Sequence, residues 1–124
     1  MKFIDSNIFA YAFYNNEFTE KCQQAIKKGG ITNTLNLIEA FFIIEKQTDQ
    51  ETAIKCIKSI LSSHIDIINV DIVILFESIK KISNHNLSIF DMIHYVTASI
   101  NNCESIITYD TDFKNLQIPR EEPD

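Results

Sequence analysis

Three short apolar runs, separated by longer segments with helical spacing, limit most strongly how this chain can fold. The runs are "KFI", "IDIINV" and "SIIT", at residues 2–4, 65–70 and 105–108. Only two glycines and two prolines interrupt the 124 residues, which predicts long elements joined by short loops. Short apolar strands that alternate with helices are typical of a parallel sheet covered on both faces. We therefore predict an α/β fold, a three-layer α/β/α sandwich around a short, mainly parallel central sheet.

The segments between the strands carry apolar residues at helical spacing and have recognisable ends. Gly29 and Gly30 are the stop signal of one helix, and Thr48 is the expected N-cap of another, with Glu51 reaching back to it. The run "IDIINV" is predicted to be a buried strand. Six helices are expected, over residues 6–13, 18–28, 35–46, 48–61, 72–83 and 89–101.

The length and the hydrophobic content of 45% are sufficient for one domain with its own core. We assign residues 1–118 to this domain and residues 119–124 to a flexible tail, of which one or two residues could extend the sheet. No apolar run approaches the roughly 20 residues that span a bilayer, so we expect a cytoplasmic protein with no membrane contact. The three cysteines suggest neither a disulfide framework nor a zinc site, and we interpret them as small core residues. The net charge of −6 argues against duplex binding through a broad basic face.

Four acidic residues stand where solvated charges are not expected. Asp5 and Asp110 each follow a predicted strand, at the edge where parallel sheets place their functional crevice. Glu39 lies within "LNLIEAFFII" and Asp91 within "LSIFDMIHYV". A carboxylate among such residues is costly unless something compensates its charge. Carboxylates that converge can hold a hard divalent cation such as Mg²⁺ or Mn²⁺, which prefers oxygen ligands.

Each acid also has a purely structural interpretation. Asp91 stands three residues after Ser88, the spacing of a capping box, and Asp5 could cap the helix that follows it. Glu39 could extend to the surface, and the acids of "YDTDF" could be turn residues. Each of these explanations covers one residue and none covers the set, which favours a shared site.

The segments "FIDSNIFAY", "LNLIEAFF", "SIFDMIHYVTAS" and "IITYDTDFKNL" resemble, in this order, the four acidic motifs of the PIN-domain ribonucleases. A single small PIN domain is similar to the VapC toxins of type II toxin-antitoxin systems. The resemblance implies a PIN-like fold and a Mg²⁺- or Mn²⁺-dependent endoribonuclease that acts on single-stranded or structured RNA. It also implies a small antitoxin partner and a homodimer, for which apolar helices such as "FTEKCQQAI" and "LNLIEAFFII" could supply the surface.

The resemblance assigns roles residue by residue. It places catalytic residues at Asp5, Glu39, Asp91 and Asp110, and metal ligands at Asp5, Asp91, Asp110 and Asp112. Either Asp110 or Asp112 is the fourth acid of the family, and we rank Asp110 first because it directly follows the strand. Asn7 and Thr108 are expected to support the ligands. His94 is three residues after Asp91 and therefore shares its helix face.

Two other functions are compatible with these motifs. A PIN-like domain can be a housekeeping RNA-processing nuclease, which only an antitoxin encoded beside it would distinguish from a toxin. It can also be a non-catalytic binding or scaffold module that keeps its acids for structure. The complete acidic set favours an enzyme.

Overall fold

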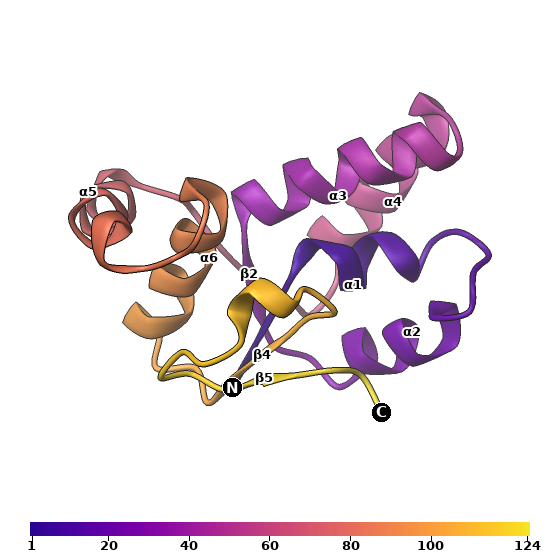
Figure 1. Cartoon of the computed structure of the whole chain (residues 1–124). Coiled ribbons are helices and arrows are strands. Elements are labelled where there is room, and N and C mark those ends of the chain that lie inside the picture. Colours follow the sequence, from indigo (N-terminus) through magenta and orange to yellow (C-terminus); the bar gives the residue numbers. More distant parts are fainter.

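The computed structural model describes all 124 residues and contains one sheet of five strands in which every pairing is parallel. The strands are β1 (Lys2–Ile4), β2 (Ile31–Asn33), β3 (Asp66–Ile68), β4 (Ser105–Ile107) and β5 (Arg120–Glu121). Their order across the sheet is β3-β2-β1-β4-β5, so the central strand is β1, which begins beside the N-terminus marked in Figure 1. The carboxyl ends of all five strands therefore meet at one edge.

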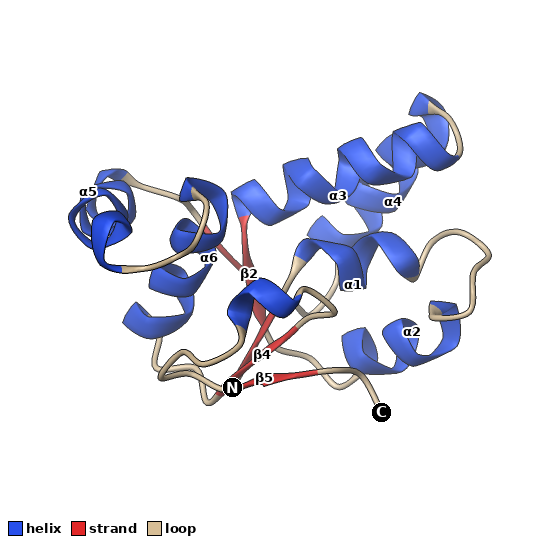
Figure 2. Ribbon diagram, viewed as in Figure 1, coloured by secondary structure: helices blue, strands red, loops and turns tan.

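Helices cover both faces of the sheet (Figure 2). They are α1 (Ser6–Tyr11), α2 (Thr19–Lys27), α3 (Thr34–Gln47), α4 (Gln50–Leu61), α5 (Ile72–Lys81) and α6 (Ile89–Ile100), with short 3₁₀ helices at Ile82–Asn84 and Thr111–Phe113. Phe3 and Ile106 pack with residues of α5 and α6, whereas Ile4 and Ile107 pack with α1 to α4. Neighbouring strand residues thus enter opposite cores, as the pleat of a strand requires. The predicted three-layer α/β/α sandwich is confirmed.

One strand, β2, was not predicted. Its sequence "ITN" has one apolar residue and follows two glycines, yet all three residues are buried between β1 and β3. Gly30 has φ of +149°, and a Cβ atom on it would lie 2.6 Å from the carbonyl oxygen of Lys2. The glycine pair ends α2 as predicted and also lets the chain approach β1 closely.

The segment "IDIINV" forms a strand, but not the buried one that was predicted. Only Asp66–Ile68 pair, and they do so at the edge of the sheet, with Asp66 exposed and Ile68 half-buried. The sequence does not distinguish an edge strand from a central one when its apolar run is continuous.

The predicted N-cap of α4 is wrong by one residue. Asp49 accepts the hydrogen bond from the backbone N–H of Thr52 at 2.7 Å and is the cap. The Thr48 hydroxyl instead donates to the carbonyl oxygen of Ile44, at the end of α3, at 2.6 Å. Adjacent threonine and aspartate are both good caps, and here the aspartate is used.

Part of the segment predicted to be a flexible tail belongs to the sheet. Arg120–Glu121 form β5 beside β4, and the half-buried Arg120 side chain fastens this strand to the preceding loop. Its Nε donates to the Asp110 carbonyl oxygen at 3.1 Å and its Nη2 to that of Thr108 at 3.3 Å. The three cysteines are buried and unpaired, as predicted. None of the helices combines the length and the apolar character that a membrane crossing needs.

Candidate metal centre

The pairing of β1 with β4 brings Asp5 to the loop that carries Asp110. Ile4 and Ile107 are partners in the register, and the Asp5 N–H donates to the Ile107 carbonyl oxygen at 3.0 Å. Thr108, the next residue, donates its hydroxyl hydrogen to Asp5 Oδ2 at 2.7 Å. The same hydroxyl oxygen accepts the N–H of Asp110 at 2.9 Å. Thr108 therefore links the two sequence-distant acids directly.

Asp5 is almost fully buried and is surrounded by hydrogen-bond donors. Its Oδ1 accepts the Ser6 N–H at 2.8 Å, which makes Asp5 the N-cap of α1. The Asn7 side-chain amide donates to Asp5 Oδ2 at 3.3 Å and to Thr108 Oγ1 at 3.2 Å. The structural and the functional interpretations of Asp5 are thus compatible, and Asn7 and Thr108 both contact it.

Three other acids form a cluster. Asp91, in the first turn of α6, and Asp110 and Asp112, after β4, each offer a carboxylate oxygen within 4.8 Å of the others. Asp91 has its own capping contact, since its N–H donates to Ser88 Oγ at 3.1 Å. Oxygen ligands of one Mg²⁺ lie about 2.1 Å from the ion and hence up to about 4.2 Å apart. Small side-chain rotations therefore suffice for these three carboxylates to hold one hard divalent cation.

Asp110 and Asp112 both belong to this cluster. Asp110 Oδ1 accepts the Asp112 N–H at 2.8 Å, which caps the 3₁₀ helix Thr111–Phe113. This turn presents both carboxylates toward Asp91. Asp5 and Glu39 are outside the three-carboxylate cluster.

Electrostatics connect Asp5 to the cluster. Burial raises the pKa of Asp91 to about 6, and the negative charges of Asp110 and Asp5 contribute to the increase. Burial also raises the pKa of Asp5, although the Thr108 hydrogen bond opposes this effect. Carboxyl groups that resist ionisation through burial and mutual repulsion are relieved when a cation binds beside them. The charge distribution thus favours a cation at this edge of the sheet.

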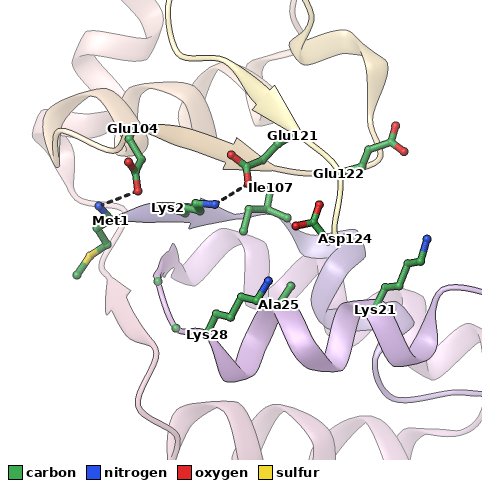
Figure 3. A pocket seen from close by; sticks show the side chains of 12 residues that line it. Met1, Lys2, Lys21, Ala25, Lys28, Glu104, Ile107, Glu121, Glu122 and Asp124 are labelled. Carbon is green, nitrogen blue, oxygen red and sulfur yellow. Dashed lines mark hydrogen bonds and ion pairs between the residues drawn. The ribbon is translucent and has the colours of Figure 1, made fainter.

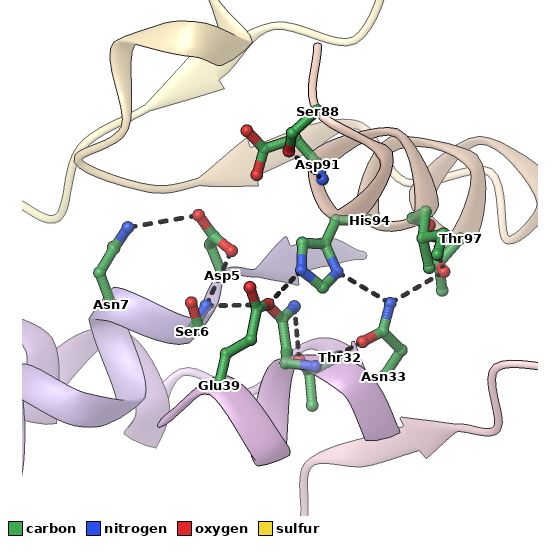
Figure 4. Close-up of polar contacts among 12 residues, drawn as sticks. Asp5, Ser6, Asn7, Thr32, Asn33, Glu39, Ser88, Asp91, His94 and Thr97 are labelled. Atoms are coloured by element: carbon green, nitrogen blue, oxygen red, sulfur yellow. Dashed lines mark hydrogen bonds and ion pairs between the residues drawn. The ribbon is translucent and has the colours of Figure 1, made fainter. Parts of the chain in front are cut away.

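Glu39 has a different environment. Its side chain, on α3, is about one-third exposed, and its Oε1 lies 2.5 Å from Nε2 of the buried His94. In Figure 4 the carboxyl groups of Asp91, Asp5 and Glu39 lie one below another, and the His94 ring lies beside them. Glu39 also adds to the negative potential that raises the pKa of Asp5. It therefore lies beside the site and is not free in solvent.

Two buried asparagines that the sequence analysis did not single out hold this region together. Asn33 contacts His94, and Asn36 accepts the Ser6 N–H at 3.1 Å on Oδ1. The Asn36 amide group donates to the Ile4 carbonyl oxygen at 3.2 Å, so it braces β1 against α3. The signal was present in "ITNTLNLIEA", where amides recur among apolar residues. A buried amide needs partners, and such partners mark a polar network.

A separate cavity lies away from the acids, at the start of β1. It has a volume of about 460 Å³ and side chains of both charges line it, with Lys2 Nζ paired to Glu121 Oε1 at 2.6 Å (Figure 3). The N-terminal amine pairs with Glu104 at 3.6 Å beside it. None of the predicted site residues lines this cavity.

The fold and the acidic edge of the sheet define a PIN domain. The model of the PIN domain family matches residues 2–119, and the chain therefore belongs to this family. Among curated proteins, no sequence matches significantly.

Solved structures of toxin-antitoxin proteins share the fold. Mycobacterium tuberculosis VapC20, described as a sarcin-ricin loop cleaving toxin, aligns with a TM-score of 0.83 and 12% identity over 95% of this chain and 96% of its own. Rickettsia felis VapBC2 bound to promoter DNA aligns with a TM-score of 0.74 and 16% identity over 99% and 98% of the two chains. A toxin-antitoxin complex from Klebsiella pneumoniae aligns with a TM-score of 0.72 and 19% identity over 94% and 93%.

Proposed function

We propose that this protein is a metal-dependent endoribonuclease that hydrolyses phosphodiester bonds in single-stranded RNA. The observation that carries the proposal is the cluster of Asp91, Asp110 and Asp112 at the carboxyl ends of the parallel strands. In the proposal these three and Asp5 hold Mg²⁺ or Mn²⁺. When bound, such a cation neutralises charge on the phosphate and makes the attacking water more acidic.

The other site residues have distinct proposed roles. Glu39 accepts a proton from the attacking water, because one of its oxygens has no hydrogen-bond partner in the protein. Thr108 and Asn7 keep the Asp5 carboxylate oriented through their hydrogen bonds to its Oδ2. No side-chain nucleophile is required.

A polar hollow beside Asp112 offers a place for the RNA next to the cleaved bond. It lies between residues 84–87 and the loop after β4, and its lining includes three asparagines and Lys114. Amide groups hydrogen-bond to base edges, and a lysine contacts phosphate. Because the net charge of −6 disfavours a broad basic RNA-binding face, we propose that RNA is bound through such local contacts and through the metal.

The test is cleavage of a fluorogenic single-stranded RNA by purified protein. We expect cutting only with Mg²⁺ or Mn²⁺, and no cutting by Asp91→Asn, which keeps the size of the side chain but removes its charge. Cleavage by clean protein that persists in excess EDTA would refute the proposal.

We further propose that the protein acts in the cytoplasm as the toxin of a type II pair, bound by a small antitoxin. Similar folds were crystallised as toxin-antitoxin complexes, from Klebsiella pneumoniae and Salmonella typhimurium among others. An almost wholly apolar groove between α3 and α4, with Ile38 and Leu61 exposed, offers surface for a partner. We expect expression of the wild-type protein to arrest growth. The Asp91→Asn variant should not arrest growth, and a small protein encoded beside the gene should relieve the arrest. A housekeeping nuclease would show neither the arrest nor its relief.

A further inference from the structure

His94 joins the glutamate of α3 to the helix that carries Asp91. Only 1% of its surface is exposed, and both ring nitrogens have a partner. Nε2 lies 2.5 Å from Glu39 Oε1, and Nδ1 lies 3.1 Å from Asn33 Nδ2. Figure 4 shows the ring between these two side chains. Because Asp91 is three residues earlier in α6, it lies on the same helix face as His94.

The direction of each hydrogen bond in this chain follows from Asn33. The Asn36 N–H can only donate, and it lies 2.8 Å from Asn33 Oδ1, so that atom must be the amide oxygen. The amide nitrogen of Asn33 therefore donates, to Thr97 Oγ1 at 3.0 Å and to His94 Nδ1. An Nδ1 that accepts carries no proton. The proton of the ring is then on Nε2, which donates to Glu39.

The Thr97 hydroxyl agrees with this assignment. It donates to the carbonyl oxygen of Ile93 at 2.7 Å, which leaves its oxygen to accept from Asn33. Asn33 is also the N-cap of α3, the helix that carries Glu39. Reversal of the amide would remove the cap, so the start of α3 fixes the tautomer of a histidine on α6.

We propose that His94 is a positioning residue for Glu39: its Nε2–H holds one carboxylate oxygen and leaves the other free to act. A glutamate that is one-third exposed otherwise has several rotamers, and the hydrogen bond selects one of them. The inference rests on the proposed function only for the part that Glu39 takes in the reaction. The tautomer and the contact stand independently of it.

The first experiment measures the ring directly. NMR of full-length protein with ¹⁵N-labelled histidine, without metal at neutral pH, is expected to show the proton of His94 on Nε2 and none on Nδ1. Asn33→Asp keeps an oxygen that caps α3 but loses the donor, so a proton should appear on Nδ1. A wild-type ring with its proton on Nδ1 overturns the inference whether or not the protein cuts RNA.

The second experiment measures single-turnover RNA cleavage. His94→Leu is expected to lower the rate on the order of tenfold with little change in KM. His94→Gln keeps an N–H near the position of Nε2 and should recover most of the loss. His64→Leu is the matched control, because His64 is exposed in the loop between α4 and β3 and makes no hydrogen bond to any of the acids.

A double-mutant comparison separates positioning from a structural role. In a Glu39→Gln background, His94→Leu should add less than about a twofold loss, because the residue through which it acts is already altered. An equal loss in both backgrounds, with unchanged melting temperatures, overturns the inference. If wild-type protein with Mg²⁺ or Mn²⁺ cuts no RNA, the proposed function is wrong. The NMR experiment still tests whether His94 Nε2–H donates to Glu39.

Discussion

The carboxyl group of Asp91 is costly to ionise in the folded protein. Its half-buried carboxyl group has a pKa raised to about 6, first by burial and then by the charges of Asp110 and Asp5. In the unfolded chain the pKa returns to about 3.9. Between these values the folded protein binds the proton more tightly, so ionisation opposes folding as pH rises through this window. Above about pH 6 the penalty is complete.

We predict that this penalty appears in the pH dependence of stability. Without metal, the free energy of unfolding of wild type relative to that of Asp91→Asn should fall between about pH 4 and pH 6 and then level off. The drop should be on the order of 1 kcal/mol, since solvent screens a half-exposed charge. Urea denaturation in EDTA at several pH values measures it. A difference between the two proteins that does not vary with pH would contradict the prediction.

Asp110→Asn should also reduce the cost of ionising Asp91, because it removes a negative charge that repels the Asp91 carboxylate. Among the charges that raise the pKa of Asp91, that of Asp110 contributes most. An asparagine at this position can still accept the Asp112 N–H that caps the 3₁₀ helix. We expect the variant to be inactive, yet to melt higher than wild type in EDTA at neutral pH.

Asp112→Asn is the control for this prediction, and its effect should be smaller because Asp112 acts more weakly on Asp91. Millimolar Mg²⁺ should stabilise wild type and do little for Asp110→Asn. An Asp110→Asn protein that melts below wild type in EDTA would mean that this carboxylate serves the fold only.

The acids of the candidate site could be singled out in the sequence because carboxylates in apolar runs are conspicuous. Glu39 and Asp91 interrupt such runs, and Asp5 and Asp110 follow strands. The partner of Glu39 was not predictable, since His94 is 55 residues away and the two helices come close only because both lie against β2. His94 was recognised only as a neighbour of Asp91 on one helix face.

At the scale of the elements, helices were easier to predict than strands. A helix of ten residues repeats its apolar spacing several times, whereas a three-residue strand shows no period. The strand β2 escaped prediction for this reason. Its burial comes from its neighbours β1 and β3 and is not visible in "ITN" itself.

Gly30 provides a test of how closely β2 approaches β1. We predict that Gly30→Ala destabilises the protein by about 2 kcal/mol or more, because its Cβ would lie 2.6 Å from the Lys2 carbonyl oxygen, a contact that the backbone must move to relieve. Gly29→Ala is the control. Its Cβ atom would contact only the His64 side chain, at 3.4 Å. The substitution would therefore cost only the backbone strain of its φ of +86°. If thermal melts show that Gly29→Ala destabilises the protein more than Gly30→Ala, then β2 does not approach β1 closely enough to exclude a Cβ atom.

At the scale of the whole molecule, apolar surface remains uncovered on two sides. The helix α5 exposes five apolar side chains: Ile72, Val73, Leu75, Phe76 and Ile79. On α3, Ile38 and Phe42 are exposed, while the apolar residues Cys22 and Ala25 of α2 face inward. The surface expected from α2 is thus absent, and α5 supplies a larger one. Monomers rarely expose contiguous apolar patches of this kind.

We predict a homodimer formed through α5. Sedimentation at micromolar concentration should report twice the chain mass of 14.3 kDa. Phe76→Lys, at the centre of the α5 patch, should yield monomers, whereas Phe42→Lys on α3 should leave the dimer intact. The reverse result would assign the dimer to α3, and a monomeric wild type would contradict the prediction.

The position of β1 at the centre of the sheet has a consequence for how the protein matures. The hydrogen bond between Asp5 and Thr108 spans 103 positions along the chain, and the β1–β4 pairing beside it is equally remote. Contacts between such distant segments close long loops and form late in folding. A partly folded chain therefore lacks the arrangement of acids, and the proposed nuclease activity should return only with the slowest refolding phase. The order of folding would then keep the proposed nuclease inactive until the native sheet is complete.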